Sequence, residues 1–145
     1  MAEGSAVMSQ IRRGFVDLPY GQMHYREAGA AHRGIPLLAL HASPGSSRQL
    51  VRLLAGLAEH GHVIAPDTPG NGDSEPLVRE PTIPQLAEAM VQLLDAKGID
   101  RVDVYGSHTG AAIAVELAIL APGRVRSVTL DGLSTFDEAE RAEIL

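Results

Sequence analysis

Two histidines and two aspartates follow short apolar segments of the sequence, and they are His41, Asp67, His108 and Asp131. An imidazole exchanges protons near neutral pH, and a carboxylate can orient it or accept a hydrogen bond from it. Short apolar runs are typical of parallel strands that are buried on both faces. Because ligands bind at the carboxyl ends of such strands, we expect the four side chains to lie on one rim, where they could support acid–base chemistry.

The most specific signal is the segment from Gly106 to Gly110, which has small residues on both sides of a central histidine. In a nucleophile elbow, small residues at this spacing allow a tight turn from strand to helix and push the central side chain into the site. The pattern places His108 at the tip and predicts a positive φ for it. Ser107 is the alternative tip residue, but Tyr105 would then stand where a small residue is needed. We expect Ser107 to line the site.

Three segments together resemble the α/β-hydrolase superfamily. Residues 40–45 (LHASPG) are similar to its oxyanion loop, residues 65–74 (APDTPGNGDS) to its Pro-Asp-x-x-Gly-x-Gly-x-Ser segment, and residues 102–110 to its strand and elbow. The segments stand in the order and spacing of the family. The resemblance runs from Phe15 to Asp131 and implies a small organic substrate.

The resemblance also implies roles for single residues. The main-chain N–H groups of Ser43 and Thr109 would form the oxyanion site, and His41 would shape the oxyanion loop and line the site. Asp131 stands where members similar to haloalkane dehalogenases carry the acid of the triad, and a plain turn carboxylate is the alternative. The sequence departs from the family at the nucleophile position, where His108 replaces the usual Ser, Asp or Cys.

Strands and helices that alternate along the chain predict the fold class. The pattern favours an α/β fold with a mostly parallel sheet of the α/β-hydrolase type and an N-terminal antiparallel hairpin. The parallel strands are expected, in their order across the sheet, at 63–65, 35–40, 101–105 and 125–130. The hairpin is expected at 15–18 and 22–27.

The resemblance covers only the first part of such a fold. Residues 14–132 are predicted to form the N-terminal portion of an α/β-hydrolase domain, after a flexible N-terminus at 1–13. Residues 133–145 are predicted to begin a cap or a C-terminal helix. The later strands, the cap and the catalytic histidine of the family are absent from these 145 residues, so a complete triad is not expected in this chain.

Composition excludes several other classes of function. A net charge of −6 and a pI near 5.4 argue against nucleic-acid binding. The chain has no cysteine, which removes disulfides and thiolate metal sites. It shows neither a membrane-spanning segment nor a signal peptide, so a cytoplasmic location without membrane contact is expected.

Other titratable residues receive less specific predictions. A divalent ion held by His41, His108 and Asp131 is disfavoured because their spacing is unlike a compact metal motif, and we predict no metal and no cofactor. Asp67 is expected to cap its turn. The remaining histidines are expected to be solvated or locally bonded in loops and at strand ends: His24, His32, His60 and His62.

Two functional hypotheses follow. In the first, the chain is an α/β-hydrolase-family protein that acts on a small organic substrate by hydrolysis or acid–base chemistry. In the second, it is a non-catalytic relative or a remnant with a binding role or none. The outer edge of the strand at 125–130 is expected to expose unpaired and apolar groups, which would favour a homo-oligomer or association with the missing C-terminal half.

Overall fold

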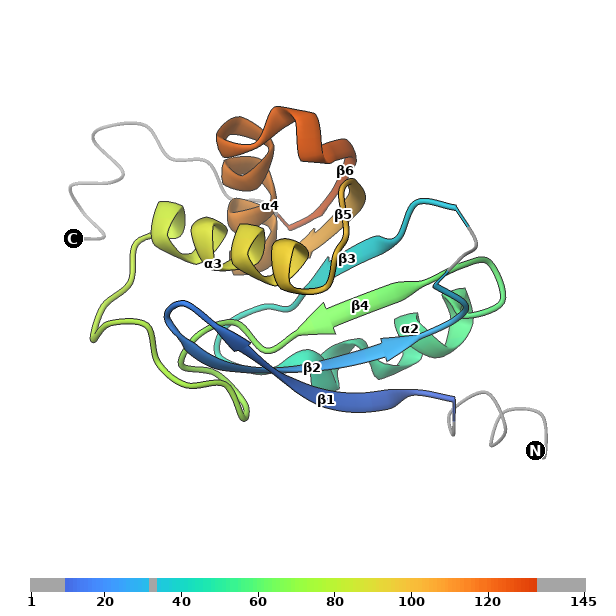
Figure 1. Ribbon diagram of the computed structural model, residues 1–145, viewed down its shortest axis with the longest axis horizontal. Helices are drawn as coiled ribbons and strands as arrows, with labels where there is room; N and C mark the ends of the chain where they lie inside the picture. The colour runs from blue at the N-terminus through green and yellow to red at the C-terminus, as the bar shows by residue number, and fades with distance from the viewer. Residues whose placement is uncertain (1–9, 32–33, 133–145) are drawn as a thin grey trace.

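The computed structural model of the chain describes residues 10–31 and 34–132. Figure 1 shows its helices and strands. The elements are β1 (Arg12–Leu18), β2 (Gly21–Ala28), β3 (Leu37–Leu40), the 3-10 turn η1 (Ser47–Leu50), α2 (Val51–Leu57), β4 (Val63–Pro66), α3 (Ile83–Ala96), β5 (Val102–Ser107), α4 (Thr109–Leu120), the 3-10 turn η2 (Pro122–Arg124) and β6 (Val125–Asp131).

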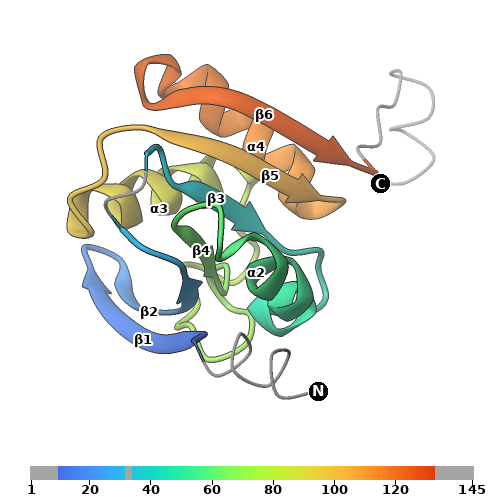
Figure 2. The ribbon, with the colours of Figure 1, turned by 90° about the vertical axis from the view of Figure 1, so that its right-hand side faces the viewer.

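The strands form one sheet in the order β1-β2-β4-β3-β5-β6 (Figure 2). β2 pairs antiparallel with both β1 and β4, whereas β4, β3, β5 and β6 are parallel neighbours. The predicted order of the parallel strands and the N-terminal hairpin are therefore confirmed. The carboxyl ends of β3, β5 and β6 consequently lie side by side on one rim.

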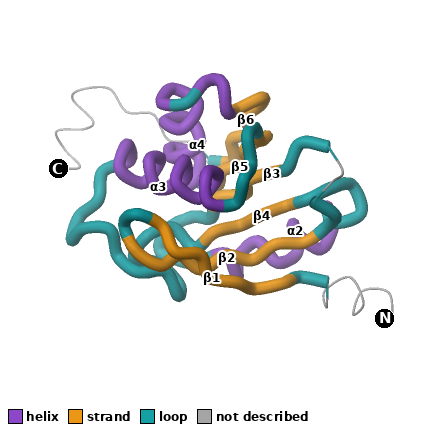
Figure 3. The backbone as a smooth tube through the Cα atoms, in the orientation of Figure 1, coloured by secondary structure: helices purple, strands orange, loops and turns teal. Residues whose placement is uncertain are grey.

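Helices cover both faces of the sheet, with α3 and α4 on one side and α2 on the other (Figure 3). Leu93, Leu117 and Val104 belong to the apolar cluster beneath α3 and α4. Leu54 and Ala39 belong to the second cluster, beneath α2. Each large aliphatic side chain buried in this way contributes about 1.5–3 kcal/mol, so the two clusters hold the sheet rigid beneath its functional rim.

The first strand begins earlier than predicted. β1 begins at Arg12, which pairs with Glu27, so residues 12 and 13 belong to the sheet and not to a flexible terminus. Residues 1–9 of the predicted N-terminal tail lie outside the described residues, as does the predicted start of a cap or C-terminal helix at 133–145. No helix among the described residues combines the length and apolar character that a bilayer crossing requires.

The edge of the sheet at β6 is less apolar than predicted. Leu117 is fully buried, and Val125 and Val128 pack partly against the core, because α4 turns back over this strand through η2. Exposure is confirmed for the remaining apolar side chains of this region: Ile119 (68%), Leu120 (45%) and Leu130 (41%). Within the described residues, β6 pairs with β5 alone, so its outer side is open.

A capping box at Thr82 begins α3. The Thr82 hydroxyl accepts from the main-chain N–H of Gln85, whose side-chain oxygen accepts in turn from the N–H of Thr82. Two of the N–H groups that a helix start leaves unpaired are thereby satisfied.

We therefore expect Thr82→Ala to lower the free energy of unfolding by about 1 kcal/mol. Chemical denaturation followed by circular dichroism measures this change. Thr82→Ser keeps the hydroxyl and is expected to retain nearly all of the stability. Equal losses in both variants would contradict the capping explanation.

Candidate functional site

His108 forms the turn between β5 and α4. Its backbone has φ 51° and ψ −107°, and among the described residues it is the one non-glycine residue with positive φ. Such a conformation costs on the order of 1–3 kcal/mol and persists only where surrounding contacts impose it. The predicted positive φ is thus confirmed, and the turn leaves His108 exposed at the start of α4.

Two glycines make this turn sterically feasible. A Cβ at Gly106 would collide with the main chain of Gly110, and a Cβ at Gly110 would collide with the main-chain oxygens of Leu40 and His41. The backbones of β3, β5 and α4 therefore approach so closely that only glycine fits at either position. This close approach brings the elbow against the loop that follows β3.

The imidazole of His108 lies against Gly132, just beyond β6. A Cβ at Gly132 would lie 2.6 Å from Cε1 and 2.8 Å from Nδ1 of His108. The main-chain N–H of His108 donates to the main-chain oxygen of Asp131 over 2.8 Å. The elbow is therefore attached to the end of β6 through its backbone.

The oxyanion-loop residues predicted from the sequence are brought to the elbow. The main-chain N–H of Ser43 donates to the Thr109 hydroxyl over a long 3.4 Å. Main-chain N–H groups in such a position can stabilise a negatively charged oxygen. In this structure the Ser43 donor is engaged by Thr109, so an oxyanion would have to displace that hydroxyl.

Gln49 supports the oxyanion loop, a role that the sequence analysis missed. Its side-chain oxygen accepts from the N–H of Ala42 over 3.2 Å, and its side-chain nitrogen donates to the Pro44 oxygen over 3.2 Å. An amide that bridges both ends of a short loop fixes its shape. A glutamine after a turn is too common a residue for the sequence alone to signal this contact.

His41 is fully buried and bonded through both ring nitrogens. Nδ1 lies 2.8 Å from the Ala42 oxygen, and Nε2 accepts from the N–H of Thr68 over 3.1 Å. Burial lowers the pKa of His41 despite the opposing effects of the Ala42 oxygen and the Asp67 charge. A neutral ring with the proton on Nδ1 satisfies both bonds, so His41 joins the loops after β3 and β4.

The two predicted catalytic side chains are not bonded to each other. Oδ2 of Asp131 accepts from the hydroxyl of Tyr105 over 2.9 Å, and no bond within the described residues joins the carboxylate to His108. Ser107 pairs with Asp131 across β5 and β6 and is half-buried. Asp131 and His108 consequently share the rim while their side chains have different neighbours.

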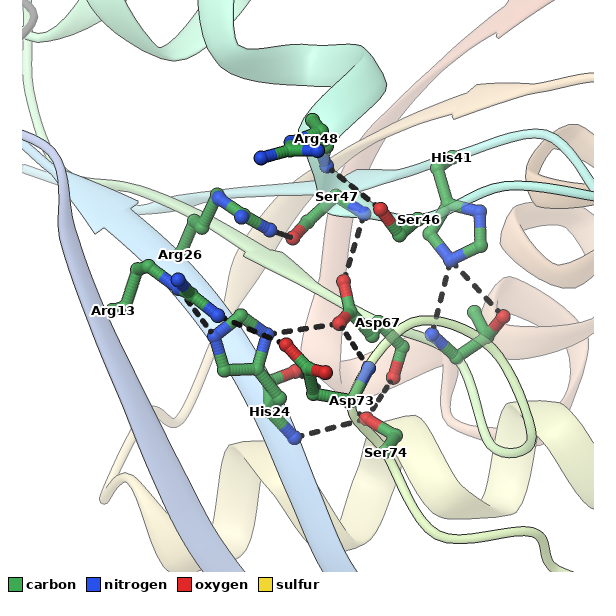
Figure 4. Close-up of polar contacts among 11 residues, drawn as sticks. Arg13, His24, Arg26, His41, Ser46, Ser47, Arg48, Asp67, Asp73 and Ser74 are labelled. Atoms are coloured by element: carbon green, nitrogen blue, oxygen red, sulfur yellow. Dashed lines mark hydrogen bonds and ion pairs between the residues drawn. The ribbon is translucent and has the colours of Figure 1, made fainter.

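Asp67 is the centre of a buried polar network (Figure 4). Oδ1 accepts from the N–H of Ser47 over 2.8 Å, and Oδ2 accepts from the N–H of Asp73 over 3.0 Å and lies 2.8 Å from Nδ1 of His24. Burial raises the pKa of this carboxyl, but the hydrogen bonds from Ser47, Asp73 and His24 outweigh it and hold the pKa below its ordinary value. The expectation that Asp67 caps its turn is confirmed.

His24 corrects a prediction. It was expected in a loop or at a strand end, but it lies within β2, is fully buried and accepts at Nε2 from Nε of Arg13 over 3.0 Å. The reason is that the loop after β4 packs over this face of β2, where Ser74 and Asp67 bond the main chain and the ring of His24. His62, just before β4, is buried and lies 2.9 Å from Glu27, which agrees with the expected bonding at a strand end. His60 is exposed as expected, and His32 falls outside the described residues.

The described residues contain one group that could hold a metal ion, and it differs from the set weighed in the sequence. The ligand atoms of His24, Asp67 and Asp73 lie within 4.8 Å of one another. Arg13 already bonds both His24 and Asp73, the latter over 2.9 Å. A metal would have to displace this guanidinium, so the cluster is complete as a hydrogen-bonded ion-pair network.

A hollow of about 580 Å³ opens beside the oxyanion loop at Ser43. Its wall carries the apolar side chains of Leu77, Val78 and Leu86, and Arg79 supplies a positive charge. These residues come from the loop before α3 and from its first turns. They showed no recognisable motif in the sequence, so their place beside the site was not predicted.

The sheet order, the elbow and the adjoining oxyanion loop define a hydrolase-type α/β domain. The sequence matches the family model described as alpha/beta hydrolase fold over residues 35–144. The chain belongs to this family.

Curated relatives agree with this assignment. An uncharacterized hydrolase of Saccharomyces cerevisiae is 35% identical over 116 residues, which are 79% of this chain and 39% of the relative. A 2-hydroxy-6-oxononadienedioate/2-hydroxy-6-oxononatrienedioate hydrolase of Pseudomonas putida is 35% identical over 136 residues, which are 90% of this chain and 46% of the relative. The chain thus spans less than half the length of these relatives.

Solved structures give the same result. The epoxide hydrolase CorEH is 29% identical, with a TM-score of 0.79 over 92% of this chain and 49% of that chain. The N-acyl homoserine lactonase AidH is 26% identical, with a TM-score of 0.74 over 83% of this chain and 44% of that chain.

The lowered pKa of Asp67 has a consequence for acid stability. A carboxyl whose pKa is lower in the folded than in the unfolded chain stabilises the fold above its ordinary value of 3.8, and this contribution disappears as the pH falls through the folded pKa. We expect Asp67→Asn to lower the free energy of unfolding at pH 7 by about 1–3 kcal/mol. The variant should also lose less stability than the parent below pH 4, as denaturation curves across the range can measure.

Asp73→Asn is the matched control, because Asp73 lies in the same loop but its carboxylate is exposed and paired with Arg13. We expect this change to alter stability by less than about 1 kcal/mol. A loss in Asp73→Asn as large as in Asp67→Asn would show that the burial of the Asp67 carboxylate is not the cause.

Proposed function

We propose that the chain carries the elbow and oxyanion loop of an enzyme that acts on a small organic molecule, with His108 as the reacting side chain. The observation that carries the proposal is the strained, exposed position of His108 at the first turn of α4, with φ 51° and ψ −107°. This conformation presents the imidazole where the family's elbow presents its nucleophile. The name of the Pseudomonas putida relative, a hydrolase of a small dioate, supports a small-molecule substrate.

His108 would act as a general base. One ring nitrogen takes a proton from water, and the water oxygen bonds to the substrate carbonyl carbon. The electron pair of the C=O bond moves to its oxygen, which accepts hydrogen bonds from the N–H groups of Ser43 and Thr109. The tetrahedral carbon then expels the leaving group, which takes the proton back from the imidazolium.

Asp131 would assist by its negative charge at the same rim. Its main chain bonds the elbow at His108, so the carboxylate is carried close to where the imidazolium forms. Ser107, half-buried on β5, would line the site, whereas His41 is fully buried and would act only by fixing the oxyanion loop from beneath. The proposal requires no metal and no cofactor.

A non-catalytic family relative is the second candidate. It is favoured by the bond from the Ser43 N–H to the Thr109 hydroxyl, which occupies an oxyanion donor within the chain. Such a protein could bind a small molecule in the hollow beside Ser43 without converting it.

His108→Ala in the protein as it occurs naturally is expected to reduce turnover of small esters or lactones by roughly 10²–10⁴-fold, the usual contribution of a general base. Ser107→Ala should have a much smaller effect. The 145-residue chain alone should turn over a simple activated ester little or not at all. Steady-state kinetics on a substrate panel measures these differences.

The outcomes separate the candidates. If Ser107→Ala abolishes activity and His108→Ala does not, the reacting residue has been placed one position off. If the parent protein converts no member of the panel but binds one in calorimetry, the non-catalytic candidate holds. The native mass of the protein, measured alongside, gives the length of chain that carries the activity.

We also propose a cytoplasmic protein whose open β6 edge associates with a second copy or with further hydrolase polypeptide. The unpaired strand edge and the exposed side chains of Ile119 and Leu120 support this. The purified 145-residue chain should therefore elute as a dimer or larger species in size-exclusion chromatography with light scattering. The double variant Ile119→Lys/Leu120→Lys should shift it toward monomer. A parent chain that is a stable monomer would contradict the proposal.

A further inference from the structure

Tyr105 connects the interior of the sheet to the functional rim. It lies on the α2 side of β5, and its ring packs against the apolar cluster that includes Leu54 and Ala39. Its hydroxyl extends beyond that cluster and donates to Oδ2 of Asp131 over 2.9 Å. The ring is therefore fixed by packing while the polar end reaches a charged group.

Asp131 depends on this contact for its orientation. It ends β6 and is exposed, so packing does not restrain its side chain. Its main chain is held by the N–H of His108, but its carboxylate has Tyr105 as its hydrogen-bond partner within the described residues. Without the phenol, the carboxylate of an exposed strand end would sample several rotamers.

We infer that Tyr105 is the positioning residue of Asp131: its hydroxyl holds Oδ2 and leaves Oδ1 free to accept a hydrogen bond from a protonated group of the site. The effect of Tyr105 on catalysis rests on the proposed function. The elbow motif does not indicate this role of Tyr105, because it requires small residues on both sides of His108 and leaves position 105 unspecified.

The titration of Tyr105 agrees with this geometry. Burial raises the pKa of Tyr105, the hydrogen bond and charge of Asp131 raise it further, and the Ser107 hydroxyl beside it acts weakly in the opposite direction. A phenolate next to a carboxylate is disfavoured, so the tyrosine keeps its proton and remains a donor.

The contact can be measured without any enzyme assay. The chain has no tryptophan and three tyrosines, so Tyr20→Phe/Tyr25→Phe leaves Tyr105 as the one absorbing phenol. In this background, alkaline titration of phenolate absorbance should give a midpoint above 10, and Asp131→Asn should move it down toward 10. Tyrosine fluorescence at neutral pH should rise in the same variant, because a carboxylate acceptor quenches the phenol.

Asp103→Asn is the matched control. Asp103 lies on β5 two residues from Tyr105 and on the same face, but its carboxylate bonds Arg126 and Ser127. Its removal should leave the Tyr105 midpoint unchanged. If the background variant does not fold, the difference between the titrations of the parent and of Tyr105→Phe gives the same midpoint.

The kinetic consequence is tested by Tyr105→Phe, which keeps the ring and removes the hydroxyl. We expect kcat to fall about tenfold, KM to stay within about twofold and Tm to remain within a few degrees. Tyr25→Phe removes a hydroxyl that bonds Lys97 and not Asp131, so it should leave kcat unchanged.

Failure of the inference and failure of the proposed function give different results. A Tyr105 midpoint that Asp131→Asn does not move overturns the inference, whatever the activity. If Asp131→Asn moves the midpoint but Tyr105→Phe leaves kcat unchanged, the contact exists but does not assist catalysis, and the inference is overturned. An inactive parent protein with the midpoint moved overturns the proposed function and retains Tyr105 as the residue that orients Asp131.

Discussion

The buried carboxylate of Asp67 is the interaction on which the arrangement of the rim depends. It joins three segments that are distant in sequence: β2 through His24, the turn after the oxyanion loop through Ser47, and the loop before α3 through Asp73. A buried charge without partners would cost several kcal/mol, so each segment is held where it can satisfy the carboxylate. The loops after β3 and β4 are therefore ordered before any ligand binds.

Much of the fold follows from local sequence. Apolar runs, helix caps and the family's motif order predict the parallel strands and their sequence across the sheet, because short buried strands and tight turns have few alternatives. The positive φ of His108 is predictable for the same reason, since the glycines at 106 and 110 are required by backbone contact and not by a distant partner. The elbow is the part of the candidate site that the sequence specifies best.

Contacts between residues that are distant in the sequence were not predictable from local sequence. The burial of His24 requires the loop after β4 to pack over β2, and the bond from Tyr105 to Asp131 requires the alignment of β5 with β6. Gln49 acts through a side-chain amide that no pattern distinguishes from any other. These residues become functional candidates only when the three-dimensional neighbours are known.

The contact between His108 and Gly132 restricts how a reagent can meet the imidazole. The backbone at Gly132 shields one side of the ring, where even a methyl group would lie within 3.0 Å of three of its atoms. The residue as a whole is exposed. Attack guided by this ring would therefore start from a single side of the molecule held in the site. Under the proposed mechanism, a bound carbonyl group would meet the attacking water on one of its two faces.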